Sequence, residues 1–106
     1  MTEKEFYVLA EEILVKLADD IEEMDKNAVL EVEYMDGILN IVMEETAQTY
    51  VINKHSASQK IWYSSPLTGA DYFVYDASSQ QWLDDKNDEL TQKLFAELSQ
   101  FIHIEK

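Results

Sequence analysis

The first part of the chain places apolar residues at a helical period. Between residues 4 and 25, apolar side chains recur every three or four positions, which predicts an amphipathic helix. The apolar stripe consists of Phe6, Leu9, Ile13, Leu17, Ile21 and Met24, with Ala10 and Leu14 broadening it. The opposite side gathers Glu5, Glu12, Asp19 and Glu23, with Glu11 and Glu22 beside them. Asp20 falls nearer the apolar edge, so we expect it at the margin between the helix and a sheet.

Alternating segments follow the helix and predict five or six strands. In residues 29–34, Leu30, Val32 and Tyr34 alternate with Glu31 and Glu33, as in a strand with one buried face. The pair Asp36-Gly37 then favours a type I′ hairpin. Similar patterns predict strands at residues 38–44, 48–54, 60–64 and 71–76, and a short sixth strand at 81–83 that would bury Trp82. Short polar connections, including one marked by Pro66 and Gly69, make these strands an antiparallel meander.

The chain closes with a second amphipathic pattern, at residues 88–103. Its apolar stripe consists of Leu90, Leu94, Leu98 and Phe101, and Asn87 or Asp88 is the expected N-cap. Two helices with one apolar stripe each can both cover the same face of a sheet. The sequence therefore predicts one α+β domain over residues 1–106. It is a two-layer sandwich with two helices packed on one face of a 5-6 stranded antiparallel sheet, in the order α-β(5–6)-α.

This arrangement leaves the other face of the sheet uncovered. Trp62 alternates with Ile61 and Tyr63, so we expect it to point to the uncovered face, together with Asn53 and Lys60. An exposed Trp is a candidate anchor for a protein partner, because Trp is enriched among interface hot spots worth about 2–4 kcal/mol. The alternative is that a terminal segment or a turn covers the indole.

Charge narrows the choice of partners. The formal net charge is −14, and all eight basic residues are lysine. Such a field repels nucleic acid and anionic membranes, and it attracts cations and basic protein surfaces. The absence of cysteine excludes disulfides and zinc–thiolate sites. No run of about eighteen apolar residues is present, and the acidic N-terminus lacks the features of a signal peptide, so we expect a soluble cytoplasmic protein.

The carboxylates are concentrated at the end of the first helix and in the first strand. We call this set the acidic ridge; it comprises Glu12, Asp19, Asp20, Glu22, Glu23, Asp25, Glu31 and Glu33. Oxygen ligands suit hard cations such as iron, manganese, calcium and magnesium. Carboxylates on a rigid helix cannot wrap around an ion, so binding is expected to be weak, mobile and multi-site. The alternative is a solvated helix face. Like charges three and four positions apart destabilise a helix, however, and this loss of stability suggests that the clustered carboxylates have a function.

Other candidate sites are weaker. His55 and His103 are not paired by spacing, so we expect exposed side chains, although His55 could add a nitrogen ligand to a secondary metal site. The segment DDKNDE at 84–89 lacks the central Gly and the closing Glu of a calcium loop, and helix capping explains it better. Ser64 and Ser65 have neither a nucleophile elbow nor a nearby His, which argues against a hydrolase.

Several motifs together resemble the frataxin family, and within it the bacterial CyaY-type proteins. The opening Glu5-Phe6 and Leu9-Ala10 resembles the family's first helix, and the acidic ridge resembles the family's own. The most specific motifs are Val51-Ile52-Asn53-Lys54, Ile61-Trp62, Ser64-Ser65-Pro66 with Gly69, Trp82, and the closing Leu94-Phe95 with Leu98. This chain departs from the family by having Gln59-Lys60 in reversed order before Ile-Trp, and Ala70-Asp71 after Gly69.

The resemblance implies a non-catalytic, iron-binding regulator of iron–sulfur cluster assembly. The implied cofactor is weakly bound ferrous or ferric iron, and the implied partners are a cysteine desulfurase and the scaffold protein. The implied partner-binding residues are Trp62, Asn53, Lys60, Asp19 and Glu23. A monomer is the default state, and iron could drive oligomers. The alternative function is a ferroxidase and iron-storage oligomer. A nucleic-acid mimic, a third hypothesis, rests on charge alone and leaves Trp62 unexplained.

Overall fold

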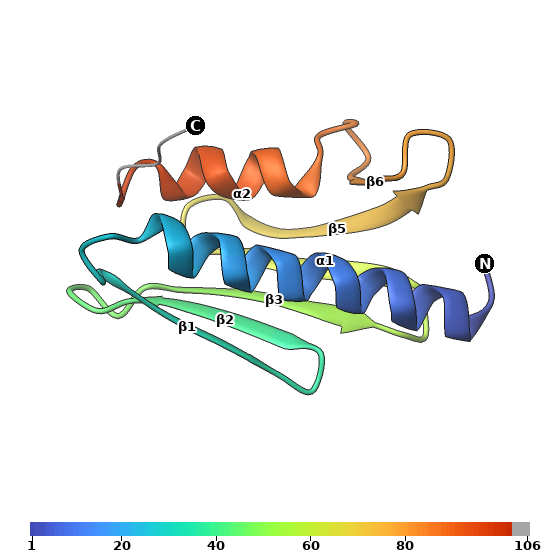
Figure 1. Cartoon of the computed structure of the whole chain (residues 1–106). Coiled ribbons are helices and arrows are strands. Elements are labelled where there is room, and N and C mark those ends of the chain that lie inside the picture. The colour runs from blue at the N-terminus through green and yellow to red at the C-terminus, as the bar shows by residue number, and fades with distance from the viewer. Residues whose placement is uncertain (103–106) are drawn as a thin grey trace.

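The computed structural model describes residues 1–102 and consists of two layers. Both helices, α1 (Glu3–Met24) and α2 (Leu90–Leu98), lie on the same side of a six-stranded sheet (Figure 1). The predicted two-layer α+β sandwich is thereby confirmed. His103, which the sequence predicted to be exposed, lies outside the described residues.

The sheet is an antiparallel meander whose spatial order equals the order along the chain. Its strands are β1 (Leu30–Met35), β2 (Ile38–Met43), β3 (Thr49–His55), β4 (Lys60–Ser65), β5 (Gly69–Asp76) and β6 (Gln81–Leu83). β5 begins two residues earlier than predicted, because Gly69 and Ala70 continue the pairing with Ser65 and Ser64. Between β1 and β2, Asp36 and Gly37 have φ of 54° and 78°, as the predicted type I′ turn requires.

Both ends of α1 are fixed by side chains that bond to the backbone. The Thr2 hydroxyl accepts from Glu5 N–H, and the Glu5 carboxylate accepts from Thr2 N–H, which forms a capping box. After the helix, the two oxygens of Asp25 accept from the N–H groups of Val29 and Leu30 at 3.0 and 2.8 Å. Asp25 therefore sets the turn that brings the chain from α1 into β1. Neither helix within residues 1–102 is long and apolar enough to cross a membrane.

The core lies between the helices and the sheet. It contains Phe6, Leu17 and Ile21 of the predicted stripe of α1, whereas Leu9, Ile13 and Met24 are only half-buried. The largest fully buried side chains come from the strands and include Tyr50, Tyr63, Phe73 and Ile61. Trp82 of β6 is buried as predicted, with its ring 5.9 Å from Phe6 in an edge-on arrangement. Burial of each such side chain contributes about 1.5–3 kcal/mol, which fixes both helices on this face.

The predictions for the second helix were wrong at both ends. The N-cap is Glu89, whose carboxylate accepts from Thr91 and Gln92 N–H, and neither Asn87 nor Asp88 has this position. Asn87 has a φ of 66°, which belongs to a left-handed turn and not to the extended backbone of an N-cap. The helix ends at Leu98 and continues only as turns through residue 102.

Candidate metal- and partner-binding surfaces

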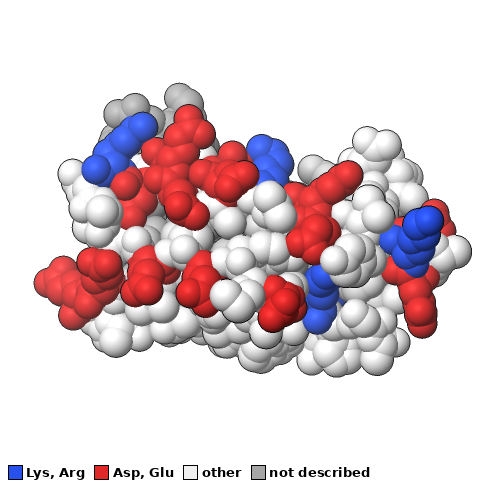
Figure 2. Space-filling model, turned by 60° about the horizontal axis from the view of Figure 1, so that its bottom comes forward, with Lys and Arg blue, Asp and Glu red and all other residues white. Residues whose placement is uncertain are grey.

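The acidic ridge forms two rows along one side of the molecule (Figure 2). The first row is on α1, where Glu12, Asp19, Glu22 and Glu23 are exposed and Asp20 is half-buried. The second row is on the edge strand β1, where exposed Glu31 and Glu33 alternate with side chains that face α1. Because α1 packs on β1, the two rows border the same edge of the sheet. The predicted gathering of these carboxylates at one edge agrees with the structure.

Two members of the acidic ridge already have partners within the protein. Asp20 forms an ion pair with Lys16, at 2.8 Å between Oδ2 and Nζ. Asp25 uses both oxygens to hold the turn before β1. The other six members have side-chain carboxylates that form no hydrogen bond or ion pair to another described residue; they are Glu12, Asp19, Glu22, Glu23, Glu31 and Glu33. These six are the carboxylates most available to a cation or a basic partner.

The ridge does not form a tight coordination cage. Within residues 1–102, no three ridge carboxylates bring an oxygen each to within 4.8 Å of one another. An ion at this edge would contact one or two carboxylates and complete its shell with water, unless the side chains turned toward it. Such a site suits weak and exchangeable binding of hard cations.

Glu11 lies between the ridge and the core, and its carboxylate is bound to other residues of the protein. Its carboxylate accepts from the Tyr34 hydroxyl and, at 3.3 Å, from Lys54 Nζ. The Tyr34 hydrogen bond is the main cause that lowers the pKa of Glu11, and burial and Glu11 together raise the pKa of Tyr34. Lys54 Nζ also lies 3.8 Å from the centre of the Tyr7 ring. These contacts fix the first half of α1 to β1 and β3.

Trp62 lies in the middle of the sheet face that neither helix covers. Its neighbours in the ladder are Asn53 of β3 and Tyr72 of β5. The indole is half-buried among its neighbours on this face, so the predicted partial exposure agrees with the structure. Asn53 and Lys60 are half-buried on the same face. The uncovered face therefore combines an aromatic centre with an amide and a cation.

The uncovered face has further exposed members that the sequence analysis did not single out. Tyr72 and Val74 are 44% and 48% exposed, more than the half-buried Trp62. His55 lies beside them, with its ring 6.2 Å from that of Tyr72 and Nδ1 2.6 Å from Ser58 Oγ. Strict alternation about Phe73 in β5 was the signal that could have placed Tyr72 and Val74 here.

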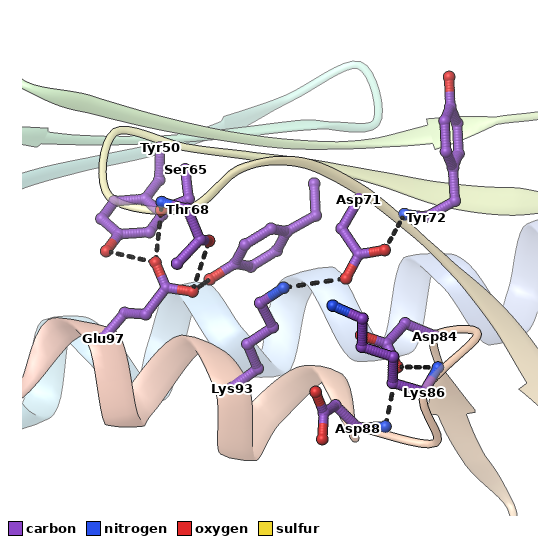
Figure 3. A network of polar contacts seen from close by, with 11 residues as sticks. Tyr50, Ser65, Thr68, Asp71, Tyr72, Asp84, Lys86, Asp88, Lys93 and Glu97 are labelled. Carbon is purple, nitrogen blue, oxygen red and sulfur yellow. Dashed lines mark hydrogen bonds and ion pairs between the residues drawn. The ribbon is translucent and has the colours of Figure 1, made fainter.

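A buried carboxylate, Glu97 of α2, was also missed. It accepts hydrogen bonds from four hydroxyl groups, those of Tyr50, Tyr63, Ser65 and Thr68 (Figure 3). Burial is the main cause that raises the pKa of both tyrosines, and the Glu97 charge adds to it. Because every hydroxyl points at the carboxylate, we assign Glu97 a structural role in holding α2 against β3 and β4.

A second acidic cluster lies at the beginning of α2. Asp71, Asp84 and Asp85 each place an oxygen within 4.8 Å of the others. Asp84 is buried and accepts from the N–H groups of Lys86 and Asp88 at 2.9 and 2.8 Å (Figure 3). Burial, together with the neighbouring Asp71, raises the pKa of Asp84.

Lys93 compensates the charge of this cluster. Its Nζ lies 2.9 Å from Asp71 Oδ2. Burial is the largest influence on Asp71 and opposes its charged form, but the hydrogen bonds with Lys93, Asp84 and the Tyr72 N–H, together with the Lys93 charge, outweigh it and lower the pKa of Asp71. Glu89 caps α2 and Asp84 holds the preceding turn, so residues 84–89 organise the start of the helix as expected.

The frataxin-like domain family matches this chain over residues 1–104. This chain belongs to the frataxin family. The resemblance derived from the sequence motifs is thereby confirmed.

Relatives of known name support a bacterial CyaY-type frataxin. The iron-sulfur cluster assembly protein CyaY of Thioalkalivibrio sulfidiphilus is 33% identical over 89 residues, which cover 84% of this chain and 81% of CyaY. Mitochondrial frataxin of Dictyostelium discoideum is 37% identical over 76 residues, which cover 72% of this chain but only 39% of that frataxin. The chain therefore matches well under half the length of the Dictyostelium protein.

Solved frataxin structures share the fold. Frataxin from Psychromonas ingrahamii superposes with a TM-score of 0.82 at 24% identity, covering 95% of this chain and 91% of that one. Trimeric frataxin from Saccharomyces cerevisiae, complexed with ferrous iron, superposes with a TM-score of 0.73 at 31% identity and covers 89% of this chain and 85% of that one.

Proposed function

We propose that this protein binds iron and takes part in iron–sulfur cluster assembly by regulating a cysteine desulfurase and scaffold complex. Its relative from Thioalkalivibrio is named as an iron-sulfur cluster assembly protein. The observation that carries the proposal is the pairing of two unlike surfaces on one rigid domain. One is an edge with six carboxylates that have no described partner, and the other is an uncovered sheet face centred on Trp62.

The acidic ridge is the proposed iron site. Ferrous and ferric ions are coordinated by carboxylate and water oxygens, and the six available carboxylates offer such ligands along α1 and β1. Since these side chains form no tight cluster, each ion would be held by few protein ligands. The protein would bind several ions weakly and release them readily. Asp20 and Asp25 would contribute mainly by their charge.

Partner docking is proposed to use both surfaces. The ridge, including Asp19 and Glu23, would attract a basic surface of the desulfurase and speed the encounter. Trp62, with Asn53 and Lys60, would then fix the complex through contacts at the uncovered face. Iron on the ridge would reduce its negative charge and weaken the attraction. In this way iron could change the rate of sulfur transfer without any chemistry by the protein itself.

An NMR titration tests the proposal. Ferrous iron, added under anaerobic conditions to the labelled protein, should broaden amide signals of residues 19–25 and 31–33 first. A cysteine desulfurase, added next, should shift the same signals, and addition of the scaffold should affect the amides around Trp62. A response to iron centred on Asp71 and Asp84 would contradict the proposed iron site. Binding of neither protein would contradict the proposed regulation.

A second candidate function is a ferroxidase and iron-storage oligomer. The observation that favours it is the trimeric yeast frataxin complexed with ferrous iron. Oxygen consumption with excess ferrous iron, measured together with size-exclusion chromatography, separates the two functions. We expect a slow response that saturates at a few ions per chain, and a monomer without iron. Sustained turnover with large assemblies would favour the storage function.

A further inference from the structure

The solvent face of α1 carries two valines where charged residues are expected. Val8 and Val15 are 46% and 39% exposed, although their helix is amphipathic and buries its other side. At about 100° per residue, both positions lie opposite the core residues Ala10 and Leu17. Val is also a weaker helix former than the Lys and Glu residues around it, because its branched side chain loses rotamer freedom. Folding alone does not explain these two residues.

The valines form the floor of a shallow apolar groove. The groove has a volume of about 560 Å³ and runs along α1 from Tyr7 to Asp20. Tyr7, which is 58% exposed, forms one end, and its ring is held in place by Lys54 at 3.8 Å. Since Lys54 is itself bound to Glu11, this end of the groove is preformed.

Two of the four acidic residues that border the groove have no described counterion. The other two are neutralised, since Glu11 pairs with Lys54 and Asp20 pairs with Lys16. Glu12 and Asp19 have no ion pair among the described residues, and each follows a valine by four positions. The apolar and acidic positions thus alternate along the helix with a repeat of seven residues, or about 10.5 Å.

We propose that this groove binds a cationic amphipathic helix of a protein partner. Two apolar side chains seven residues apart would contact Val8 and Val15, and Lys or Arg side chains beside them would pair with Glu12 and Asp19. A second copy of this chain fits poorly, because at a net charge of −14 the two acidic borders would repel. Nucleic acid and anionic membranes are excluded by the same charge. The inference rests on the proposed function only in that both assume a basic partner.

A synthetic probe tests the groove directly. The probe is a labelled peptide of about five helical turns built from Ala, Leu and Lys, with Leu at a seven-residue repeat and Lys four positions after each Leu. Its binding to the full chain is measured by fluorescence anisotropy. The double variant V8Q/V15Q should bind about tenfold more weakly, because the apolar contact area is lost while the helix and its charges remain. Added salt should weaken binding to the native protein.

Matched controls make the result specific. V74Q changes a valine of similar exposure, 48%, on the uncovered sheet face and should leave binding unchanged. A peptide of the same composition with Leu distributed around the helix should bind weakly. Equal binding of both peptides, or equal affinity of V8Q/V15Q and the native protein, would overturn the proposal.

A measurement on the native protein does not depend on folding of the variants. Methyl signals of Val8 and Val15 should shift when the peptide is added, and those of Val74 should not; the reverse pattern would overturn the proposal. Iron titrations of the same samples keep the two hypotheses apart. Loss of peptide binding in V8Q/V15Q with unchanged iron binding supports the groove. Absence of iron binding by the native protein would contradict the proposed function without affecting the peptide result.

Discussion

The hydroxyl of Tyr63 donates to Glu97 Oε2 at 2.9 Å and so joins β4 to α2 inside the protein. Glu97 is only 7% exposed, and a buried carboxylate destabilises a protein unless hydrogen bonds compensate for the lost water. Three further hydroxyls complete that compensation. Thus α2 is positioned by a polar network as well as by its apolar stripe.

Replacement of Glu97 by Ala should therefore destabilise the protein strongly. The variant would leave four hydroxyls without their acceptor, and we expect the free energy of unfolding to fall by about 3–5 kcal/mol. Urea denaturation followed by circular dichroism measures this. Gln92→Ala, at an exposed position of the same helix, should change the free energy by less than about 0.5 kcal/mol. Equal stability of the two variants would show that the network contributes nothing.

Trp62→Ala should separate binding from stability. Because Trp62 is half-buried on the uncovered face, we expect its loss to weaken binding to the desulfurase and scaffold complex by about 2 kcal/mol or more. The melting temperature should fall by only a few degrees, as expected for roughly 1 kcal/mol in a domain of this size. Trp82→Ala, which removes a buried indole, should cost about 3–5 kcal/mol of stability. Comparable losses of stability in both variants would place Trp62 in the core.

Neutralisation of the ridge on α1 should raise stability and reduce iron binding. The variant D19N/E22Q/E23Q removes the repulsion between acidic residues three and four positions apart. Each such pair lowers helix stability by a few tenths of a kcal/mol, so the free energy of unfolding should rise. The gain should be measurable by thermal unfolding at low salt and should shrink at high salt. Binding of ferrous iron should be largely lost. A less stable variant at low salt would show that these carboxylates support the fold.

Tyr34→Phe should change how stability depends on pH. In the native protein, the Tyr34 hydroxyl holds the pKa of Glu11 below its ordinary value of 4.5. A lowered pKa in the folded state contributes stability above the unfolded-state pKa, and this contribution is lost as the pH falls through the folded-state value. We therefore expect the variant to be about 1 kcal/mol less stable at pH 7, with the difference shrinking below pH 4.5.

The control for this pH prediction is Tyr72→Phe. Its side chain is 44% exposed, and its hydroxyl forms no hydrogen bond to another described residue. The stability of this variant should follow that of the native protein at every pH. A difference between native protein and Tyr34→Phe that stays constant down to pH 3 would contradict the role assigned to Glu11.

The sequence predicted the strands well because alternation and turn residues are local signals. The uncovered face followed from counting the layers, since two amphipathic helices could pack on only one side of the sheet. The position of Trp62 was predictable for this reason. Glu97 was not, because its partners Tyr50, Tyr63, Ser65 and Thr68 come from distant parts of the chain, and nothing within α2 indicates that they converge.

The helix start at Glu89 was missed for a related reason. Asn87 and Asp88 have the composition of an N-cap, but Asp84 accepts the Asp88 N–H and holds the preceding turn, so the helix begins one step later. The distinction between available and committed carboxylates in the ridge likewise needed the structure. In the sequence, Asp20 differs from its neighbours by its place near the apolar edge and by Lys16 four positions before it, but nothing marks Asp25, whose bond from the Val29 N–H appears only in the structure.

The place of Glu31 and Glu33 on β1 has a consequence for solubility. β1 is the outermost strand on its side of the sheet, and no other strand within residues 1–102 pairs with its outward-facing backbone groups. Negative side chains on such a strand keep a foreign strand from extending the sheet. We therefore expect the carboxylates at this rim to protect the chain against aggregation as well, and a cation that neutralises them to weaken that protection.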